Sequence, residues 1–336
     1  MYKVGLVGCG RWGPNLLRNF HNHRLFEVAW VCDCAEQMRQ KIVAQYPQLL
    51  AGSDFGEMLA SYPVDIAVIA TPLSTHFALA KQALQSGCHV FIEKPLAPTA
   101  EECRQLISLA ESKHRLLFTD FTYAYHPEIL FIQEQVHNGY LGERLLTYQS
   151  RRVNWGPVRR DINAIGDLAV HDFSVLHLLH PQPPLSVSAT GSSFVEGEPV
   201  NLAFIDVTYP DGFSAHINVN WYSPRKLRNL VLSGNQRIIS YDELSSHNRL
   251  LVYDCRLPSR EELPTIDSLN QGMRLWAPEF SINEPLRLVV ENFARCLDSG
   301  DMASDNHALC LLVARLLDAA NASLERNGDA VDVEPE

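Results

Sequence analysis

The stretch Lys3-Val4-Gly5-Leu6-Val7-Gly8-Cys9-Gly10-Arg11-Trp12-Gly13 decides the fold of the amino-terminal part of the chain. An apolar run of strand length leads into a G-x-G-x-x-G pattern, and a helical pattern over residues 15–21 follows. In such a strand–turn–helix unit, Gly8 allows a tight turn, Gly10 lets the backbone approach a pyrophosphate, and Gly13 permits close packing of helix on strand. The helix N-terminus then offers N–H groups and positive dipole to phosphates. This order of elements predicts a dinucleotide-binding site, with a glycine turn in an unliganded α/β domain as the alternative.

An acidic residue at the end of the second strand supports the same prediction. Asp33 follows Val31-Cys32, about 20 residues after the glycines, where such sites carry an acid. Its carboxylate can accept hydrogen bonds from both ribose hydroxyls and would repel a 2′-phosphate. The sequence therefore favours NAD(H) over NADP(H).

The first 120 residues alternate between strand-like and helical patterns. Five apolar, β-branched runs are separated by helical periodicity, at residues 3–8, 27–32, 64–70, 89–92 and 115–118. Nearly continuous Val/Ile/Leu strands separated by helices indicate a parallel sheet covered on both faces. After Phe121 most strands are grouped together, with helices to one side. We therefore expect an α/β protein with a doubly wound domain at 1–120 and an α+β domain at 121–336.

Composition excludes several functional classes. The chain has 336 residues, of which 46% are hydrophobic and 20% charged, as in a soluble globular protein. Its 28 Lys+Arg against 39 Asp+Glu give a net charge of −11, opposite to a typical nucleic-acid-binding surface. We find no apolar run of about 18 residues and no secretory leader. The eight cysteines are irregularly spaced and indicate reduced thiols in a cytoplasmic protein. We expect no nucleic acid, membrane or metal partner.

Two predicted strand ends carry unusual residues. Ala70-Thr71-Pro72, with His76 shortly after, ends one strand, and Glu93-Lys94-Pro95 ends the next. Ligands of doubly wound sheets gather at the carboxyl ends of strands. An apolar strand that delivers Glu-Lys to this edge is hard to explain by packing, although a surface lysine paired with Glu93 is the alternative. Pro95 is a candidate for a cis peptide bond.

A second constellation lies within a predicted helix over residues 165–180. Asp167 and His171 are i, i+4 neighbours and share a face opposite the apolar stripe. A carboxylate beside an imidazole raises its basicity and fixes its tautomer, which suits proton transfer. A solvated i, i+4 pair is the simpler alternative. Asp172 lies on the apolar stripe, where we expect a buried, hydrogen-bonded acid.

Together these residues resemble the Gfo/Idh/MocA oxidoreductase family. The resemblance covers nearly the whole chain and rests on Gly8–Gly13, Asp33, Ala70–Pro72, Glu93–Pro95 and the Asp167…His171 pair. It implies an N-terminal Rossmann domain and a C-terminal domain built on a large, mostly antiparallel sheet that mediates homodimers or homotetramers. The implied reaction is oxidation of a secondary alcohol on a sugar or cyclitol with NAD.

The resemblance also suggests roles for individual residues. His171 is the expected base, Asp167 orients it, and Lys94 stabilises the negative charge that develops on the reacting oxygen. The expected cofactor-binding residues are Gly8, Gly10, Arg11, Trp12, Gly13, Asp33, Thr71, Pro72, His76, Glu93 and Lys94. The expected substrate contacts are Tyr123, Arg152, Asn154 and Asn163.

The segment from Arg152 to Asp172 looks closest to the nucleotide-sugar dehydrogenases, which oxidise C3 of a UDP-N-acetylhexosamine or its uronic acid. That subgroup is expected to have Trp where Gly166 stands and Pro where Val170 stands. The alternatives are an inositol, a free or phosphorylated sugar or an amino-sugar as substrate, or a non-catalytic NAD-binding regulatory protein.

Overall fold

The computed structural model describes residues 1–156, 159–257, 274–280 and 283–334. The chain forms two compact units, and neither is one continuous segment. The first comprises Met1–Tyr125 and Asn283–Arg315, and the second comprises His126–Ile282 and Leu316–Glu336. Helix α10 (Ser304–Glu325) contributes its first half to the first unit and its second half to the other.

The first unit is built on a six-stranded sheet of order β3-β2-β1-β4-β5-β6. All five strand pairs are parallel, so the predicted doubly wound sheet is confirmed. Its strands are β1 (Tyr2–Val7), β2 (Phe26–Cys32), β3 (Leu50–Gly52), β4 (Ile66–Ile69), β5 (His89–Glu93) and β6 (Leu117–Asp120). The sequence analysis missed β3, a three-residue edge strand without a buried residue.

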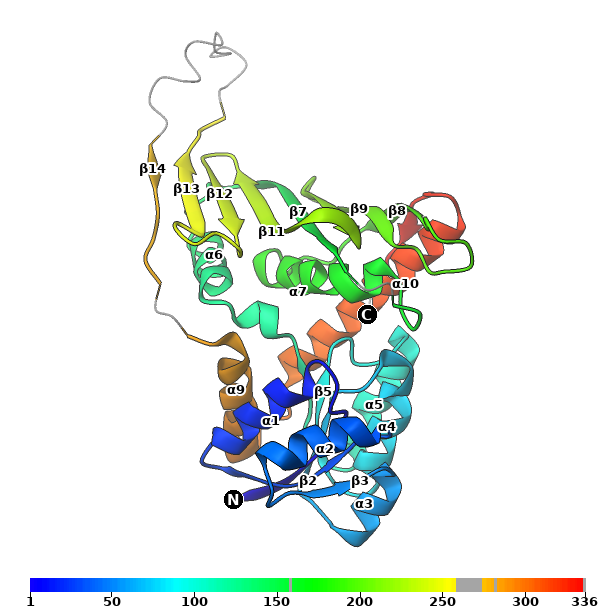
Figure 1. The fold of residues 1–336 in the computed structure, drawn as a ribbon. Coiled ribbons are helices and arrows are strands. Elements are labelled where there is room, and N and C mark those ends of the chain that lie inside the picture. Colours follow the sequence, from blue (N-terminus) through cyan, green and yellow to red (C-terminus); the bar gives the residue numbers. More distant parts are fainter. Residues whose placement is uncertain (157–158, 258–273, 281–282, 335–336) are drawn as a thin grey trace. The chain divides into compact units, whose positions relative to one another are not determined.

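Helices cover both faces of this sheet (Figure 1). They are α1 (Gly13–Asn22), α2 (Glu36–Gln45), α3 (Phe55–Ser61), α4 (Leu73–Gln85), α5 (Ala100–Ser112) and α9 (Pro285–Ser299). On one face Phe293 of α9 packs against Phe20 of α1 and Phe91 of β5, with ring centroids 6.1 and 5.3 Å apart. This aromatic cluster explains why residues 283–299, far along the chain, belong to the first unit.

The start of α10 covers the exposed edge of β6. The amide of Asn306 accepts from the Thr119 N–H at 2.8 Å and donates to the Thr119 carbonyl at 3.0 Å. His307 Nε2 lies 2.9 Å from the Leu117 carbonyl. These side chains pair with backbone groups that an edge strand would otherwise leave open to another chain.

The second unit contains a nine-stranded sheet of order β14-β13-β12-β11-β7-β10-β9-β8-β15. The β10–β7 pair is parallel, and the other pairs are antiparallel. This confirms the prediction of a large, mostly antiparallel sheet. The strands are β7 (Leu145–Trp155), β8 (Ser186–Ser192), β9 (Leu202–Thr208), β10 (Ser214–Asn220), β11 (Tyr222–Gly234), β12 (Arg237–Asp242), β13 (Leu250–Asp254), β14 (Leu275–Trp276) and β15 (Val331–Asp332).

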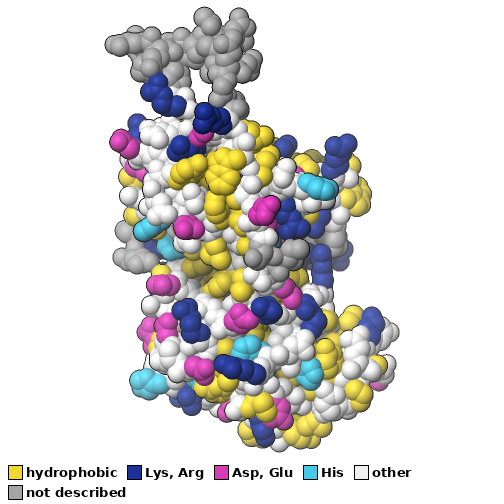
Figure 2. All heavy atoms as spheres, turned by 90° about the vertical axis from the view of Figure 1, so that its left-hand side faces the viewer, with side chains coloured by type: hydrophobic (Ala, Val, Ile, Leu, Met, Phe, Trp, Pro, Cys, Tyr) yellow, Lys and Arg dark blue, Asp and Glu magenta, His cyan; other side chains and the backbone are white. Residues whose placement is uncertain are grey.

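Alternate side chains of this sheet point to opposite faces. In β9, Ala203, Ile205 and Val207 are buried, whereas Phe204 between them is 54% exposed. Helices α6 (Pro127–His137) and α7 (Val170–Leu179) pack against each other under the sheet (Figure 1). Hydrophobic side chains also gather on the face over α6 and β14 (Figure 2), where Trp276 meets Phe131 edge-on with ring centroids 6.1 Å apart.

One helix, α10, is long and apolar enough to cross a membrane by length and composition alone. In its most apolar window, 61% of the residues are buried inside the protein. A core helix of a soluble protein has these same properties, so the test adds no support for a membrane span.

Candidate active site

The glycine loop between β1 and α1 has the geometry that the sequence predicted. Gly8 has φ +95°, and a Cβ there would lie 2.3 Å from the Ala70 carbonyl oxygen. A Cβ on Gly13 would lie 2.1 Å from the Gly8 carbonyl oxygen. Around Gly10, in contrast, a Cβ would meet nothing within 4 Å among the described residues. The outer glycines thus allow the tight turn, and the central one leaves its side of the loop open to a ligand.

Asp33, directly after β2, is tied to this loop. Its Oδ2 accepts from the Cys9 N–H at 2.7 Å, and its Oδ1 accepts from the Ala35 N–H at 2.8 Å. A carboxylate has about four acceptor positions, so both oxygens keep capacity for ribose hydroxyls. The open side of Gly10, the N-terminus of α1 and this carboxylate together fit the pyrophosphate and ribose of NAD.

His76 joins the two strand ends that the sequence analysis singled out. The imidazole is 1% exposed, with Nδ1 2.9 Å from the Pro95 carbonyl and Nε2 2.9 Å from the Thr71 carbonyl. Burial is the main cause that lowers the pKa of His76. The Lys94–Pro95 peptide bond is cis, as expected. The lowered pKa favours the neutral ring, which has a single N–H, so His76 donates to one of these two carbonyls while its ring lies between Thr71 and Pro95.

The end of β5 presents Glu93 and Lys94, and the sequence analysis missed the acid beside them. Asp120, at the end of β6, is the direct neighbour of Glu93 in the sheet register. Asp120 is 1% exposed, and its carboxylate accepts a hydrogen bond from the hydroxyl of Thr122. Burial, with the negative charge of Asp120 as the second cause, raises the pKa of Glu93 well above its usual value. Asp120 could have been identified from the sequence, because it is a polar residue at the carboxyl end of an apolar strand.

In the second unit, Asp167 lies in a π-helical turn over Ile165–Ala169, and His171 lies in the first turn of α7. The prediction of one continuous α-helix was therefore wrong in its first turn. Every residue from Ala164 to Leu176 is described, and among them only Asp167 and His171 are partly exposed. The prediction that these two side chains face away from the core together is confirmed. Single π-turns within helices are frequent at functional sites.

Two side chains that the sequence analysis did not assign to the site hold Asp167. Arg159 Nη1 donates to Oδ1 at 3.1 Å, and Trp221 Nε1 donates to Oδ2 at 3.1 Å. Arg159 also binds Asp161, with Nη2 2.6 Å from Oδ2. The carboxylate is thus fixed in place from both of its oxygens. Arg159 and Trp221 lie 8 and 54 residues from Asp167 in the sequence, and no helix or strand periodicity relates them to it. Their contacts with Asp167 could therefore be identified only from the fold.

Asp172 is the buried acid that the apolar stripe predicted. It is 0% exposed, and it accepts from Tyr148 OH at 2.6 Å and from Arg152 Nε at 2.7 Å. Arg152 is 3% exposed. The structure thus gives Arg152, an expected substrate contact, a buried ion pair that anchors α7 on β7.

Two of the other expected substrate contacts also have internal partners. Asn163 caps the π-turn, because its Oδ1 accepts from the Gly166 N–H at 3.0 Å, and its amide nitrogen donates to Asn321. Asn154 accepts from Arg228 at 2.6 Å. Tyr123 is 6% exposed. Contact of these residues with a substrate stays a prediction.

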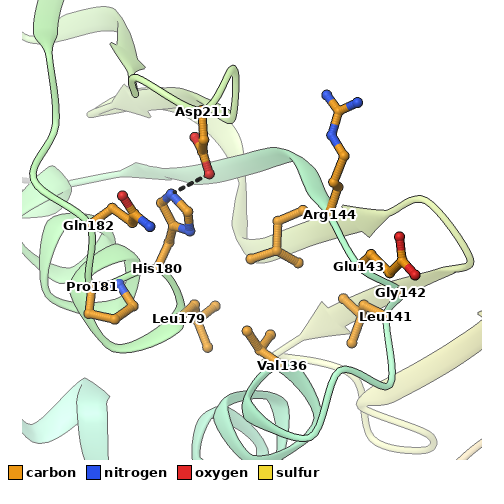
Figure 3. A pocket seen from close by; sticks show the side chains of 11 residues that line it. Val136, Leu141, Gly142, Glu143, Arg144, Leu179, His180, Pro181, Gln182 and Asp211 are labelled. Carbon is orange, nitrogen blue, oxygen red and sulfur yellow. Dashed lines mark ion pairs between the residues drawn. The ribbon is translucent and has the colours of Figure 1, made fainter.

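A pocket of about 550 Å³ lies at the carboxyl end of α7 (Figure 3). His180 and Asp211 meet there, with Nε2 3.3 Å from Oδ2. Its lining contains none of the predicted catalytic, cofactor or substrate residues. The described residues contain no group of three or more His, Cys, Asp or Glu that could hold a metal.

The chain is similar in sequence and in fold to known sugar and cyclitol dehydrogenases. UDP-N-acetylglucosamine 3-dehydrogenase of Acidithiobacillus ferrooxidans is 27% identical over 298 residues, which are 88% of each chain. Inositol 2-dehydrogenase of Rhizobium meliloti is 26% identical over 58% of this chain and 59% of its own length. The WlbA dehydrogenase of Bordetella pertussis, solved with NADH and UDP-GlcNAcA, has a TM-score of 0.83 at 20% identity, covering 99% of this chain and 98% of its own.

The family comparison covers both units. Residues 2–121 match the family described as an oxidoreductase family with an NAD-binding Rossmann fold, and residues 129–240 match the GFO/IDH/MocA C-terminal domain. The glycine loop, the strand-end lysine and the two domain architectures agree with these matches, and the chain belongs to the Gfo/Idh/MocA family of NAD-binding oxidoreductases, dehydrogenases that act on CH–OH groups.

Proposed function

We propose that this protein oxidises a secondary alcohol of a nucleotide-linked sugar, with NAD as the oxidant, at C3 of a UDP-hexosamine or its uronic acid. The observation that carries this proposal is the 27% identity to a UDP-N-acetylglucosamine 3-dehydrogenase over 88% of both chains. No comparable coverage supports the inositol reading, where 58% of this chain is matched.

NAD, when bound, supplies the hydride acceptor. The cofactor residues we propose are Gly8, Gly10, Arg11, Trp12, Gly13, Asp33, Thr71, Pro72, His76, Glu93 and Lys94. Gly10 and the N-terminus of α1 receive the pyrophosphate, and Asp33 receives a ribose. His76 acts indirectly, because its buried ring lies between the Thr71 and Pro95 carbonyls.

The chain's own residues handle the proton and the developing charge. His171 takes the proton of the substrate hydroxyl, and Asp167, fixed by Arg159 and Trp221, orients the imidazole. Lys94 donates a hydrogen bond to the reacting oxygen and stabilises its negative charge. Tyr123, Asn154 and Asn163 are proposed substrate contacts, and Arg152 contributes by supporting α7. We propose a cytoplasmic homodimer or homotetramer formed through the nine-stranded sheet.

The test is a panel of alcohols offered with NAD to the purified protein: UDP-GlcNAc, its uronic acid, UDP-glucose, inositols and free hexoses. We expect reduced nicotinamide to appear with one UDP-linked sugar. Lys94→Met should lower kcat by about 10²–10³-fold, the usual cost of losing one donor to a developing oxyanion, while NADH still binds.

A matched control is Lys81→Met, an exposed lysine on α4, which should leave kcat unchanged. Turnover of an inositol or a free hexose in preference to every UDP-sugar would replace the proposed substrate. Normal turnover by Lys94→Met would remove that lysine from the mechanism.

A further inference from the structure

Two carboxyl groups meet at the cofactor edge of the first unit. Glu93 ends β5 and Asp120 ends β6, and the two are paired in the parallel register. Asp120 is 1% exposed, and Glu93 is partly buried. The negative charge of Asp120 acts on Glu93 and helps to raise its pKa.

Ionised carboxylates are acceptors only, so a hydrogen bond between two of them requires a proton. Glu93 Oε1 and Asp120 Oδ2 are buried atoms that meet no donor among the described residues. Two negative charges on neighbouring carboxyl groups inside a protein are strongly unfavourable, and such pairs hold one proton between them.

We propose that Glu93 and Asp120 share one proton, and that Asp120 is a positioning residue that uses this proton to hold Glu93 and the adjacent Lys94 in place. The inference rests on the proposed roles of Glu93 and Lys94, and it assigns a role to an acid that the proposed function does not use. According to this proposal, the affinity of the site for NADH depends on a single proton.

The surroundings place the proton mainly on Glu93. Asp120 already accepts from the hydroxyl of Thr122, which favours its ionised form. Burial raises the pKa of both acids, and Lys94 opposes the rise at Glu93. Tyr125, whose pKa is raised mainly by burial and also by the charge of Asp120, is a further titratable neighbour.

The proposal predicts weaker binding of NADH at high pH. When the shared proton leaves, two adjacent negative charges repel and compete for the Lys94 ammonium. Wild-type affinity for NADH should then fall at alkaline pH by up to about tenfold per pH unit, the limit for one lost proton.

Asp120→Asn tests this directly, because the variant pair keeps a donor and carries one fixed negative charge. NADH binding, followed by fluorescence, should match wild type near neutral pH, and its alkaline fall should be flattened. Glu93→Gln serves if Asp120→Asn folds poorly: it removes a proposed cofactor residue, so NADH affinity should be lower throughout, but its alkaline fall should be flattened in the same way. Asp120→Leu should weaken binding at every pH. Glu101→Gln, an exposed acid on α5, should leave the wild-type profile unchanged.

Infrared spectroscopy gives a readout that a merely structural role would not change. The difference spectrum of wild type minus Glu93→Gln should contain the C=O stretch of a protonated carboxylic acid at neutral pH. A difference spectrum without that band, or an unchanged alkaline limb in both Asp120→Asn and Glu93→Gln, would overturn the proposal. Neither experiment needs a sugar, so failure here is distinguishable from a wrong substrate.

Discussion

Each unit contains a buried acid in its proposed working part, and the partners of the two acids differ. In the first unit, Glu93 faces Asp120, acid against acid. In the second, Asp172 faces Arg152, with Tyr148 as a further donor. Burial alone therefore does not decide the surroundings of a carboxyl group: Glu93 has a second acid as its neighbour, whereas Asp172 has a guanidinium and a hydroxyl donor.

The largest expected effect comes from breaking the second pair. Arg152→Leu leaves the Asp172 charge buried without its guanidinium and should cost about 3–5 kcal/mol of stability. The double variant Arg152→Leu/Asp172→Leu should recover much of that loss, because both desolvation penalties disappear. Thermal unfolding of the wild type, both single variants and the double variant gives the interaction energy of the pair as a double-mutant cycle. Equal losses in the single and double variants would contradict the account.

A smaller effect is expected at Asp167, which is held by donors at both oxygens. Trp221→Phe keeps an aromatic ring but removes the N–H donor to Asp167. We expect this to lower the free energy of unfolding by about 1–2 kcal/mol. We also expect a lower kcat with little change in KM for NAD, because the carboxylate orients His171 rather than binding cofactor. Trp276→Phe, on β14, is a matched control. A change in NADH affinity as large as the change in kcat would contradict the assigned role.

The buried His126 provides a pH-dependent test of what burial does to a titratable group. Burial, with Glu128 opposing it, lowers the pKa of His126 to about 4 from an unfolded value of 6.5. The unfolded chain therefore binds more protons in this window, and stability should fall as the pH drops from 6.5 towards 4, by at most about 1.4 kcal/mol per pH unit. His126→Gln should reduce this slope between about pH 5 and 6.5. Denaturant titrations at several pH values would show an unchanged slope if the account is wrong.

The smallest effect is expected at an exposed pair. Arg104 Nε lies 3.1 Å from Glu101 Oε2, and both side chains are more than half exposed. Arg104→Ala should change stability by less than about 1 kcal/mol, because solvent already screens both charges. If Arg104→Ala lowered the free energy of unfolding as much as Arg152→Leu does, burial would not determine how much an ion pair contributes to stability.

The sequence predicted the features that depend on local patterns. The glycine loop, Asp33, the cis bond before Pro95 and the shared face of Asp167 and His171 each follow from spacing of residue types. Partners far apart in the chain could not be predicted. Asp120 reaches Glu93 through sheet register, Trp221 reaches Asp167 across 54 residues, and α9 joins the first unit through its aromatic packing. The π-turn before α7 has no sequence signature that distinguishes it from an α-turn.

The most direct measurement of the central claim is deuterium transfer from UDP-GlcNAc labelled at C3 to NAD, followed by mass spectrometry of the reduced nicotinamide. The account predicts that the deuterium appears in NADH with wild type and is reduced in amount by about 10²–10³-fold with Lys94→Met. Unlabelled NADH from the C3-labelled sugar, or equal transfer by the Lys94→Met variant, would contradict it.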